Sequence, residues 1–265
     1  ALPTGGQVVA GQASISQAAS TLTVNQASNR AALDWQTFNV GAAATVNFNQ
    51  PSSASVTLNR VLDTNPSQIF GRINANGQVF LSNPNGVYFA PGASVDVGAL
   101  VATSHTIDLA DFMAGNAKFE RNGSTGSVIN EGELKAALGG YIALLAPEVR
   151  NAGVIVAQAG TVALASGEAV TLHIEGSNSL AGITVQPSLI NALVENQQAV
   201  LAPGGLIILS AKAAAQVAGG VIKNSGRLEA SSLTEKGGKI WLEGDTLTLK
   251  SGSNINATRA TGGGE

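Results

Sequence analysis

The 265-residue sequence predicts an all-β protein folded as a β-solenoid, and three observations support this fold class. The composition holds 32 Gly but only 4% aromatic and 12% charged residues, which favours short strands and tight turns over helices. One short motif recurs three times, and a glycine followed by alternating aliphatic residues recurs four times. Repeats of about 20 residues that hold short strands are typical of coils stacked into a solenoid.

The recurring motif is Asn-x-Gly-x-(Leu/Ile)-x-Ala, and its copies begin at Asn130, Asn151 and Asn224. Asparagine at a repeated corner can stack as a hydrogen-bonded ladder, and it tolerates the left-handed backbone that a bend requires. Glycine at the corners is expected to supply positive φ angles. The motif therefore predicts a ladder of asparagine side chains along one corner of the coils.

The alternating segments predict the buried face of the coils. They begin at Gly140, Gly160, Gly205 and Gly238. Aligned, they give one aliphatic column of Ile142, Val162, Ile207 and Ile240 and a second of Leu144, Leu164, Leu209 and Leu242. The intervening positions are unlike one another, and Trp241 is among them. A period of two with one constant face predicts strands buried on one side only and excludes a helix.

The sequence is predicted to form a single domain over residues 1–265. Residues 1–50 fit the repeat poorly, and a solenoid end needs cover for its open strand edge, so they are the predicted N-terminal cap. Coils are predicted over residues 51–265. Two stretches, near 105–129 and 171–203, break the pattern and are predicted to be β excursions outside the coil, as loops or small hairpins.

Several ordered blocks of sequence match a known family. They are Asp34-Trp35-Gln36-Thr37-Phe38-Asn39-Val40, Asn65-Pro66-Ser67-Gln68-Ile69-Phe70-Gly71, Asn76-Gly77-Gln78-Val79-Phe80-Leu81 and Asn83-Pro84-Asn85-Gly86-Val87. In this order they resemble the secretion domain at the start of two-partner secretion (TPS) exoproteins, the filamentous-haemagglutinin and high-molecular-weight-adhesin group. The haemagglutinin branch carries a further Asn-Pro-Asn-Leu block upstream, which this sequence lacks, so it is more similar to the adhesin branch.

The resemblance implies a right-handed parallel β-helix and a role in secretion. It implies that the polypeptide-transport-associated (POTRA) domains of an outer-membrane β-barrel transporter recognise the chain in the periplasm. The chain then folds at the cell surface as a monomer, with no cofactor, and the passenger regions of such proteins are adhesins, haemolysins or toxins. The absence of Cys suits this route, because a disulfide formed in the oxidising periplasm would block threading through a pore.

Two tetrapeptides are the candidate site for transporter recognition or fold nucleation. The first is Asn83, Pro84, Asn85 and Gly86, and the second is Asn65, Pro66, Ser67 and Gln68. Pro, Asn and Gly in this order are typical of a structural turn that starts a coil. Direct contact with the transporter is the second reading, and the two are compatible if a partner reads the unfolded chain.

Other conspicuous residues have plainer interpretations. Trp35, Phe38 and Asn39 are assigned to the cap, where aromatic side chains fill the core. Trp241 is either an exposed ligand contact or, as we expect, covered by an excursion or by further chain. His105 and His173 have no carboxylate spacing that indicates a metal site, so none is predicted.

Several functional classes are excluded or disfavoured. A net charge of −3 without a basic patch disfavours nucleic-acid binding, and no apolar run reaches the roughly 20 residues of a membrane span. No catalytic motif is present, so no enzyme is predicted. The alternatives are an adhesin domain that binds a receptor or glycan, and a β-helical polysaccharide-active enzyme, although the outward columns hold no acidic cluster. The first and last residues favour the mature front of a longer, secreted protein.

Overall fold

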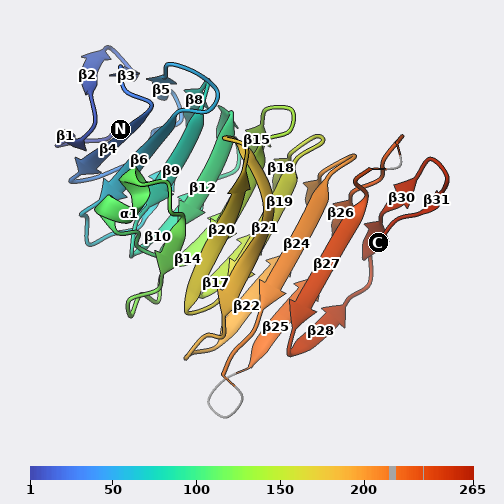
Figure 1. Cartoon of the computed structure of the whole chain (residues 1–265). Coiled ribbons are helices and arrows are strands. Elements are labelled where there is room, and N and C mark those ends of the chain that lie inside the picture. The colour runs from blue at the N-terminus through green and yellow to red at the C-terminus, as the bar shows by residue number, and fades with distance from the viewer. Residues whose placement is uncertain (215–218, 235) are drawn as a thin grey trace.

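The chain folds as a parallel β-helix in a computed structural model that describes residues 1–214, 219–234 and 236–265 (Figure 1). From β6 (Val56–Val61) onward each coil contributes one strand to each of three sheets, which we call faces 1, 2 and 3, and successive coils pair in parallel. The predicted all-β solenoid is therefore confirmed. Strand β16 on face 1, for example, is followed by β17 on face 2 and β18 on face 3 before β19 returns to face 1.

Face 1 contains β1 (Gln7–Ala10), β4 (Arg30–Trp35), β6 (Val56–Val61), β9 (Gln78–Ser82), β12 (Ala99–Thr103), β16 (Tyr141–Leu145), β19 (Thr161–Ser166), β24 (Leu206–Ala211) and β27 (Lys239–Gly244). Face 2 contains β7 (Ser67–Ile69), β10 (Gly86–Phe89), β14 (Ser127–Asn130), β17 (Glu148–Asn151), β22 (Ala192–Asn196), β25 (Gly220–Asn224) and β28 (Thr246–Leu249). Face 3 contains β2 (Ala13–Ala18), β3 (Thr21–Gln26), β5 (Thr45–Asn49), β8 (Arg72–Ala75), β11 (Ser94–Val97), β15 (Glu133–Ala136), β18 (Val154–Val156), β23 (Ala199–Leu201), β26 (Arg227–Glu229) and β29 (Asn254–Asn256).

The two predicted aliphatic columns lie in register inside the coils. Ile142 pairs with Val162, Val162 with Ile207 and Ile207 with Ile240 along face 1. The leucine column repeats this order two residues further on, and both columns contribute to one continuous inner core. The column prediction is therefore confirmed, because stacked coils place equivalent residues of each repeat in contact.

The glycines that begin these segments let neighbouring coils approach closely, and most of them do not adopt a positive φ. At Gly140, Gly160 and Gly205 φ is not positive, contrary to the expectation for corner glycines, whereas Gly238 has φ +72°. A Cβ atom at Gly160 would overlap the carbonyl oxygen of Gly140, and one at Gly205 would overlap that of Gly160. The coils pass one another too closely here for any side chain.

The predicted asparagine ladder exists and has one more member than the motif shows. The Nδ2 of Asn130 donates to the Oδ1 of Asn151, Asn151 donates to Asn196, and Asn196 donates to Asn224, each over 2.9 Å. All four residues are buried. Asn196 escaped the sequence pattern because Gln198 stands where the other copies have glycine.

The N-terminal end is closed by antiparallel strands. Strand β1 pairs antiparallel with β4, and β2 pairs antiparallel with β3. Parallel pairing already begins at β3 and β4, so the range 1–50 assigned to the cap also contains the first parallel coil. Trp35 and Phe38 are buried there with their rings edge to face at 5.6 Å, and the Nε1 of Trp35 donates to Asn59 Oδ1 over 2.9 Å.

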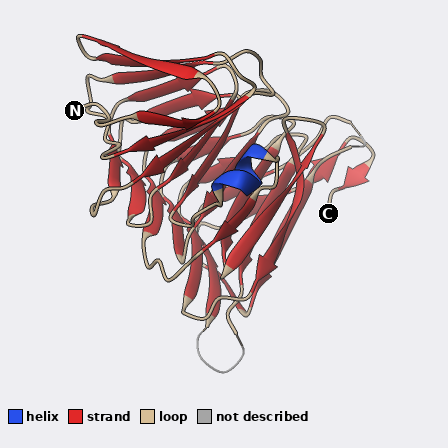
Figure 2. Cartoon of the chain, turned by 60° about the vertical axis from the view of Figure 1, so that its left-hand side comes forward, coloured by secondary structure: helices blue, strands red, loops and turns tan. Residues whose placement is uncertain are grey.

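The excursions form a second layer outside face 1, visible in front of the coils in Figure 1 and around the helix in Figure 2. They supply helix α1 (Leu109–Met113) and a sheet of β13 (Lys118–Glu120), β20 (Ala169–Glu175) and β21 (Ser179–Gln186). A hairpin of β30 (Thr258–Arg259) and β31 (Gly262–Gly263) lies near the C-terminus. Within the range 171–203 the excursion covers only β20 and β21, since β22 and β23 belong to the coil.

The outer layer corrects two expectations. The helix α1 was not predicted, and strands β16 and β19 are buried on both faces rather than one. Their outward residues, such as Ala143 and Ala163, pack in a second hydrophobic core with Phe112 and Phe119 of the excursion. Small side chains on the outer face of these strands let the excursion sheet pack directly against the coil.

Candidate functional site

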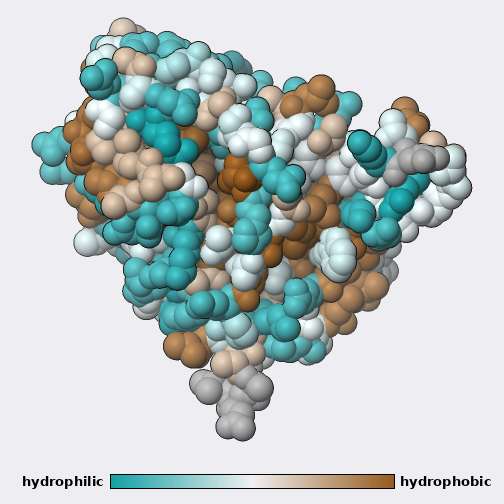
Figure 3. All heavy atoms as spheres, in the orientation of Figure 1, coloured by the Kyte–Doolittle hydropathy of each residue, from teal (hydrophilic) through white to brown (hydrophobic). Residues whose placement is uncertain are grey.

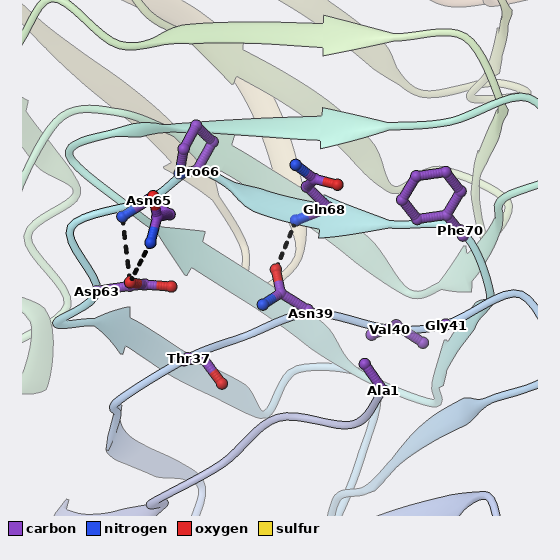
Figure 4. A pocket seen from close by; sticks show the side chains of 10 residues that line it. All are labelled: Ala1, Thr37, Asn39, Val40, Gly41, Asp63, Asn65, Pro66, Gln68 and Phe70. Carbon is purple, nitrogen blue, oxygen red and sulfur yellow. Dashed lines mark hydrogen bonds between the residues drawn. The ribbon is translucent and has the colours of Figure 1, made fainter.

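The two candidate tetrapeptides lie side by side on successive coils. Residues 83–86 connect β9 to β10, residues 65–68 lead into β7 one coil earlier, and Ser67 pairs with Val87 in the parallel ladder of face 2. Asn39, assigned to the cap, reaches the same place, because its Oδ1 accepts a hydrogen bond from the backbone N–H of Gln68 at 2.9 Å (Figure 4). The fold thus brings together two motifs and one cap residue.

Residues 83–86 form a closed turn that is locked into the coil. The N–H of Gly86 donates to the carbonyl of Asn83 over 2.9 Å, and Gly86 adopts a φ of +113° that disfavours any other residue. The N–H of Asn83 donates to the carbonyl of Thr103 in the following coil over 3.0 Å. Asn83 is fully buried, so its amide is not available to a partner in the folded domain.

The turn is also bonded to the coil before it. The Nδ2 of Asn83 donates to the carbonyl of Asn65 and to the Oγ of Ser67, both over 3.0 Å. The Nδ2 of Asn85 donates to the carbonyl of Asp63 over 2.5 Å. The buried amide of Asn83 is therefore paired. Together these bonds join the turn before β10 to the preceding coil, which contains β7, the first strand of face 2.

Residues 65–68 share an Asx turn with the first tetrapeptide, in which the N–H of Asn85 donates to Asn83 Oδ1 over 3.0 Å. The N–H of Asn65 is taken by the Oδ1 of Asp63 over 3.1 Å, which is an Asx turn. Because the Gln68 N–H bonds to Asn39, a side chain from the previous coil occupies the edge of β7. The backbone continues this contact, since the N–H of Val40 donates to the carbonyl of Gln68 over 3.0 Å.

Exposure separates the candidate residues into two groups. Asn83, Gly86 and Ser67 are buried and act within the fold. The others lie at the surface: Pro84, Asn65, Pro66 and Gln68 are exposed and Asn85 is half-buried. A partner that meets the folded domain can therefore touch only this second group.

Two hollows of about 470 Å³ each flank Pro66. The first, drawn in Figure 4, is lined by Ala1, Thr37, Asn39, Val40, Gly41, Asp63, Asn65, Pro66, Gln68 and Phe70. The second is lined in part by Pro66, Pro84, Asn85 and Tyr88. Phe70 and Tyr88 stand between them with their rings edge to face at 6.2 Å. The sequence reasoning missed this aromatic pair, although equal offsets from the two tetrapeptides would have indicated it.

The histidines are not part of this site. His105 is fully buried, and among the described residues neither of its ring nitrogens has a hydrogen-bond partner. Burial lowers the pKa of His105 to about 4, so the imidazole is neutral in the folded domain at neutral pH. His173 is exposed on β20 and lies 2.6 Å from the hydroxyl of Thr184.

Catalytic chemistry is not indicated by the arrangement. In the described ranges no group of three or more His, Asp or Glu side chains is placed to hold a metal ion. The helix in the described part of the chain is too short to cross a membrane. The residues described so far define the protein as a capped parallel β-helix with an outer layer on face 1 and two bonded turns on face 2.

The sequence matches the family model of the TPS secretion domain over residues 1–257. The chain belongs to this family, as the sequence blocks implied. TPS secretion domains are parts of secreted exoproteins and are not enzymes, which confirms the prediction of a non-catalytic secretion module.

Relatives and a solved structure agree with this assignment. The chain is 34% identical over 261 residues to a heme/hemopexin-binding protein of Haemophilus influenzae strain Rd, and 31% identical over 271 residues to a second heme/hemopexin-binding protein of that species. These alignments include 96% and 93% of the chain but only 28% of each relative. The crystal structure of the HMW1 secretion domain from Haemophilus influenzae matches 97% of the chain and 74% of that structure, with a TM-score of 0.77 and 26% identity.

Proposed function

We propose that residues 1–265 act as one monomeric unit that targets a large exoprotein for secretion and nucleates its fold. In this proposal the POTRA domains of a cognate outer-membrane transporter recognise the chain in the periplasm, and the β-helix forms at the cell surface. Membership of the TPS secretion domain family supports a transporter partner. The absence of Cys agrees with a chain that must stay threadable until it emerges.

The hydrogen bonding of Asn83 is the observation on which the proposal for the two tetrapeptides rests. Its buried side chain joins residues 65–68 to residues 83–86, and its backbone joins the turn to the following coil. A coil that closes on the previous one in this way gives the next coil a template for pairing. The same residues become accessible in an unfolded chain, where the transporter can read them before they are buried.

Export of point variants tests the proposal. The exoprotein is produced with its transporter, and the amount in the culture medium is measured for Asn83→Ala and Asn85→Ala. Both variants are expected to lower export at least several-fold. Asn49→Ala is the matched control, since Asn49 is exposed and its side chain makes a single bond, to Asn25, over 3.0 Å. Unchanged export in both motif variants would confine the motif to a dispensable turn.

Pro84 separates recognition from folding. Pro84 is exposed, so Pro84→Ala is expected to change the free energy of unfolding by less than about 1 kcal/mol. If the transporter contacts the motif directly, export of this variant falls while its stability stays the same. If the motif acts only through the fold, export follows stability, and Pro84→Ala exports as well as the parent chain.

A role in heme acquisition is the second candidate for the protein that carries this domain. It rests on two relatives that are named heme/hemopexin-binding proteins and that align with almost the whole chain. Binding of hemopexin to the isolated domain would place that activity within residues 1–265. The high-molecular-weight-adhesin resemblance favours instead a surface adhesin, which a glycan array on the same domain would detect.

A further inference from the structure

The outer layer covers face 1 only in part. Over β16 and β19 the excursions bury outward residues such as Ala143 and Ala163 completely. On β24 and β27 the equivalent Ile208 is 9% exposed and Trp241 is 58% exposed, and Figure 3 shows hydrophobic surface gathered there. The expectation that an excursion covers Trp241 is therefore wrong. The first excursion reaches instead the corner between faces 1 and 2, where residues 83–86 lie.

The first excursion returns to the coil through residues 121–127, which we call the closing segment. Asn122 and Gly123 have φ angles of +45° and +78°, and the N–H of Ser124 donates to the carbonyl of Arg121 over 2.9 Å. Positive φ at both central residues is typical of a type I′ turn, for which Asn-Gly is a preferred sequence. The local sequence therefore favours this turn, and the turn fixes the position of Ser124.

Ser124 bonds to the candidate turn of the preceding coil. Its Oγ donates to the carbonyl oxygen of Pro84 over 2.6 Å, across a separation of 40 residues in the sequence. The same Oγ accepts the N–H of Gly126 over 3.2 Å, so the hydroxyl is held from both sides. Residues 83–86 are thus bonded to the coil that follows them as well as to the coil before.

The closing segment also lies backbone against backbone with the candidate turn. A Cβ atom at Gly126 would lie 2.6 Å from the carbonyl carbon of Asn85 and 2.6 Å from the nitrogen of Gly86, so no side chain fits there. A Cβ atom at Gly86 would lie 2.6 Å from the carbonyl oxygen of Ser127, with which Gly86 pairs in the ladder of β10 and β14. Residues 124–127 therefore cover the turn on the side that the preceding coil leaves open.

A largely buried ion pair fastens the closing segment to the second excursion. Arg121 donates through Nη1 to the carbonyl of Ser124 over 3.0 Å, and through Nε to Oε2 of Glu168 over 2.9 Å. The same Oε2 accepts the N–H of Leu189 over 3.1 Å. Because Glu168 follows Arg121 by 47 residues, the closing segment is fastened only when a long stretch of later chain has folded.

Residues 83–86 therefore come in the chain well before the segment that covers them. Until that segment folds, the carbonyl of Pro84 and the backbone of Gly86 remain accessible to a partner. We propose that folding of the closing segment over residues 83–86 ends their recognition by the transporter. This mechanism rests on the proposed function, in which the transporter reads these residues. Ser124 is then a positioning residue, which acts on the recognition site without being read itself.

Binding of the folded domain to the periplasmic part of the transporter tests this proposal. Ser124→Ala removes the bond to Pro84, and the folded variant is expected to bind about threefold more tightly than the folded parent domain, because its turn is uncovered more often. Gly126→Val adds a side chain where none fits, and about a tenfold gain is expected. Unfolded chains of both variants, diluted from denaturant, are expected to bind like the unfolded parent chain.

Three further variants serve as controls and are expected to bind like the parent domain. Ser179→Ala removes an exposed hydroxyl bond, to the carbonyl of Gly139 over 3.4 Å. Gly182→Val adds a side chain at a glycine of β21 whose Cβ would meet no described atom within 4 Å. Leu228→Ala removes a fully buried side chain of β26, so it lowers stability at a distance from the closing segment.

The pattern of binding separates the possible outcomes. If the unfolded parent chain binds but folded Ser124→Ala binds no more tightly than the folded parent, the proposal is wrong, and Ser124→Ala alone decides this if Gly126→Val does not fold. Equal tightening in Leu228→Ala would assign the effect to general unfolding and would also overturn the proposal. Binding by none of the chains, folded or unfolded, would contradict the proposed function itself and the role of the closing segment with it.

Discussion

The inner and outer hydrophobic cores of this domain are built by different rules. Inside the coils, equivalent positions of successive repeats stack on one another, so Ile142, Val162 and Ile207 form one column. Outside face 1, the core joins outward residues of the coils to excursion residues that have no repeat relation to them. The ring of Phe80 on β9, for example, lies 5.8 Å from that of Phe112 and 5.7 Å from that of Phe119. The inner core can grow with the number of coils, whereas the outer core is a single closed cluster.

This difference has a consequence for stability. A stacked coil interacts with its two neighbours, so the loss of one inner contact destabilises only that coil and the coils next to it. The outer layer is tied to several coils at once, and a salt bridge of 2.9 Å between Arg121 and Glu168 joins its two excursions. We expect the layer to make the central coils unfold as one unit.

The largest effect is expected at the centre of the outer core. Phe119 is fully buried, and Phe119→Ala should lower the free energy of unfolding by about 4 kcal/mol, because it removes a large side chain and leaves a cavity. Denaturant unfolding measures this change. The control is Phe70→Ala, at a position that is 40% exposed, where a much smaller loss is expected. Equal losses at the two positions would mean that the outer layer does not contribute to cooperative unfolding.

A slightly smaller effect is expected in the inner core. Leu164 is fully buried between Leu144 and Leu209, and Leu164→Ala should cost about 3 kcal/mol in the same measurement. Leu138→Ala, at a position that is 75% exposed, should be close to neutral. In Leu164→Ala, amide hydrogen exchange should become faster in β16, β19 and β24 than in the other coils. Uniform acceleration across all coils would contradict the nearest-neighbour character of the inner core.

The asparagine ladder should show an intermediate effect. Asn151 is buried, accepts a hydrogen bond from Asn130 and donates one to Asn196. Asn151→Ala should cost about 2 kcal/mol, since it leaves buried amide groups of its neighbours unpaired. Asn49→Ala removes one exposed amide bond and should cost less than about 0.5 kcal/mol. A neutral Asn151→Ala would show that water replaces the missing amide.

The smallest effect concerns pH and the start of the first excursion. Burial lowers the pKa of His105 to about 4, below the value of about 6.5 in an unfolded chain. A lowered histidine pKa means that the unfolded chain binds the proton more readily, so stability is lost as the pH falls below about 6.5. Between pH 7 and 5.5 the loss should be about 1 kcal/mol.

Comparison with a variant isolates this contribution. The carboxylate of Glu168 and the guanidinium of Arg121 also act on His105, so the whole domain has other pH-dependent terms. The loss between pH 7 and 5.5 should therefore be measured for the parent chain and for His105→Leu, and the difference should equal the His105 contribution. The same pH dependence in both chains would show that protonation of His105 does not lower the free energy of unfolding.

The features that could be predicted from the sequence are those that recur from coil to coil or depend on neighbouring residues. The columns of face 1 and the ladder at Asn130, Asn151 and Asn224 follow from a period of two and a repeated corner residue. Asn196 was missed because a hairpin separates it from Asn151 and Gln198 replaces the glycine of the motif. The sequence pattern identified a strand by its alternation but not whether another layer covers its outer face.

The outer layer and the paired turns depend on contacts between distant residues. Phe119 pairs with Val170, and Asn39 bonds to Gln68, without any local signal that joins them. The tetrapeptides were identified as turns with a role in secretion, but their bonding to one another follows only from the register of β7 and β10. The burial of Asn83 and the exposure of Pro84 likewise follow from the stacking of coils.

Binding of the domain to the purified periplasmic part of its cognate transporter tests the central claim most directly. The measurement is made by pull-down and by titration calorimetry, with the chain presented both folded and unfolded in denaturant that is then diluted. We predict saturable binding, stronger for the unfolded chain because Asn83 and Ser67 are then accessible. No binding by either form of the chain would contradict transporter recognition.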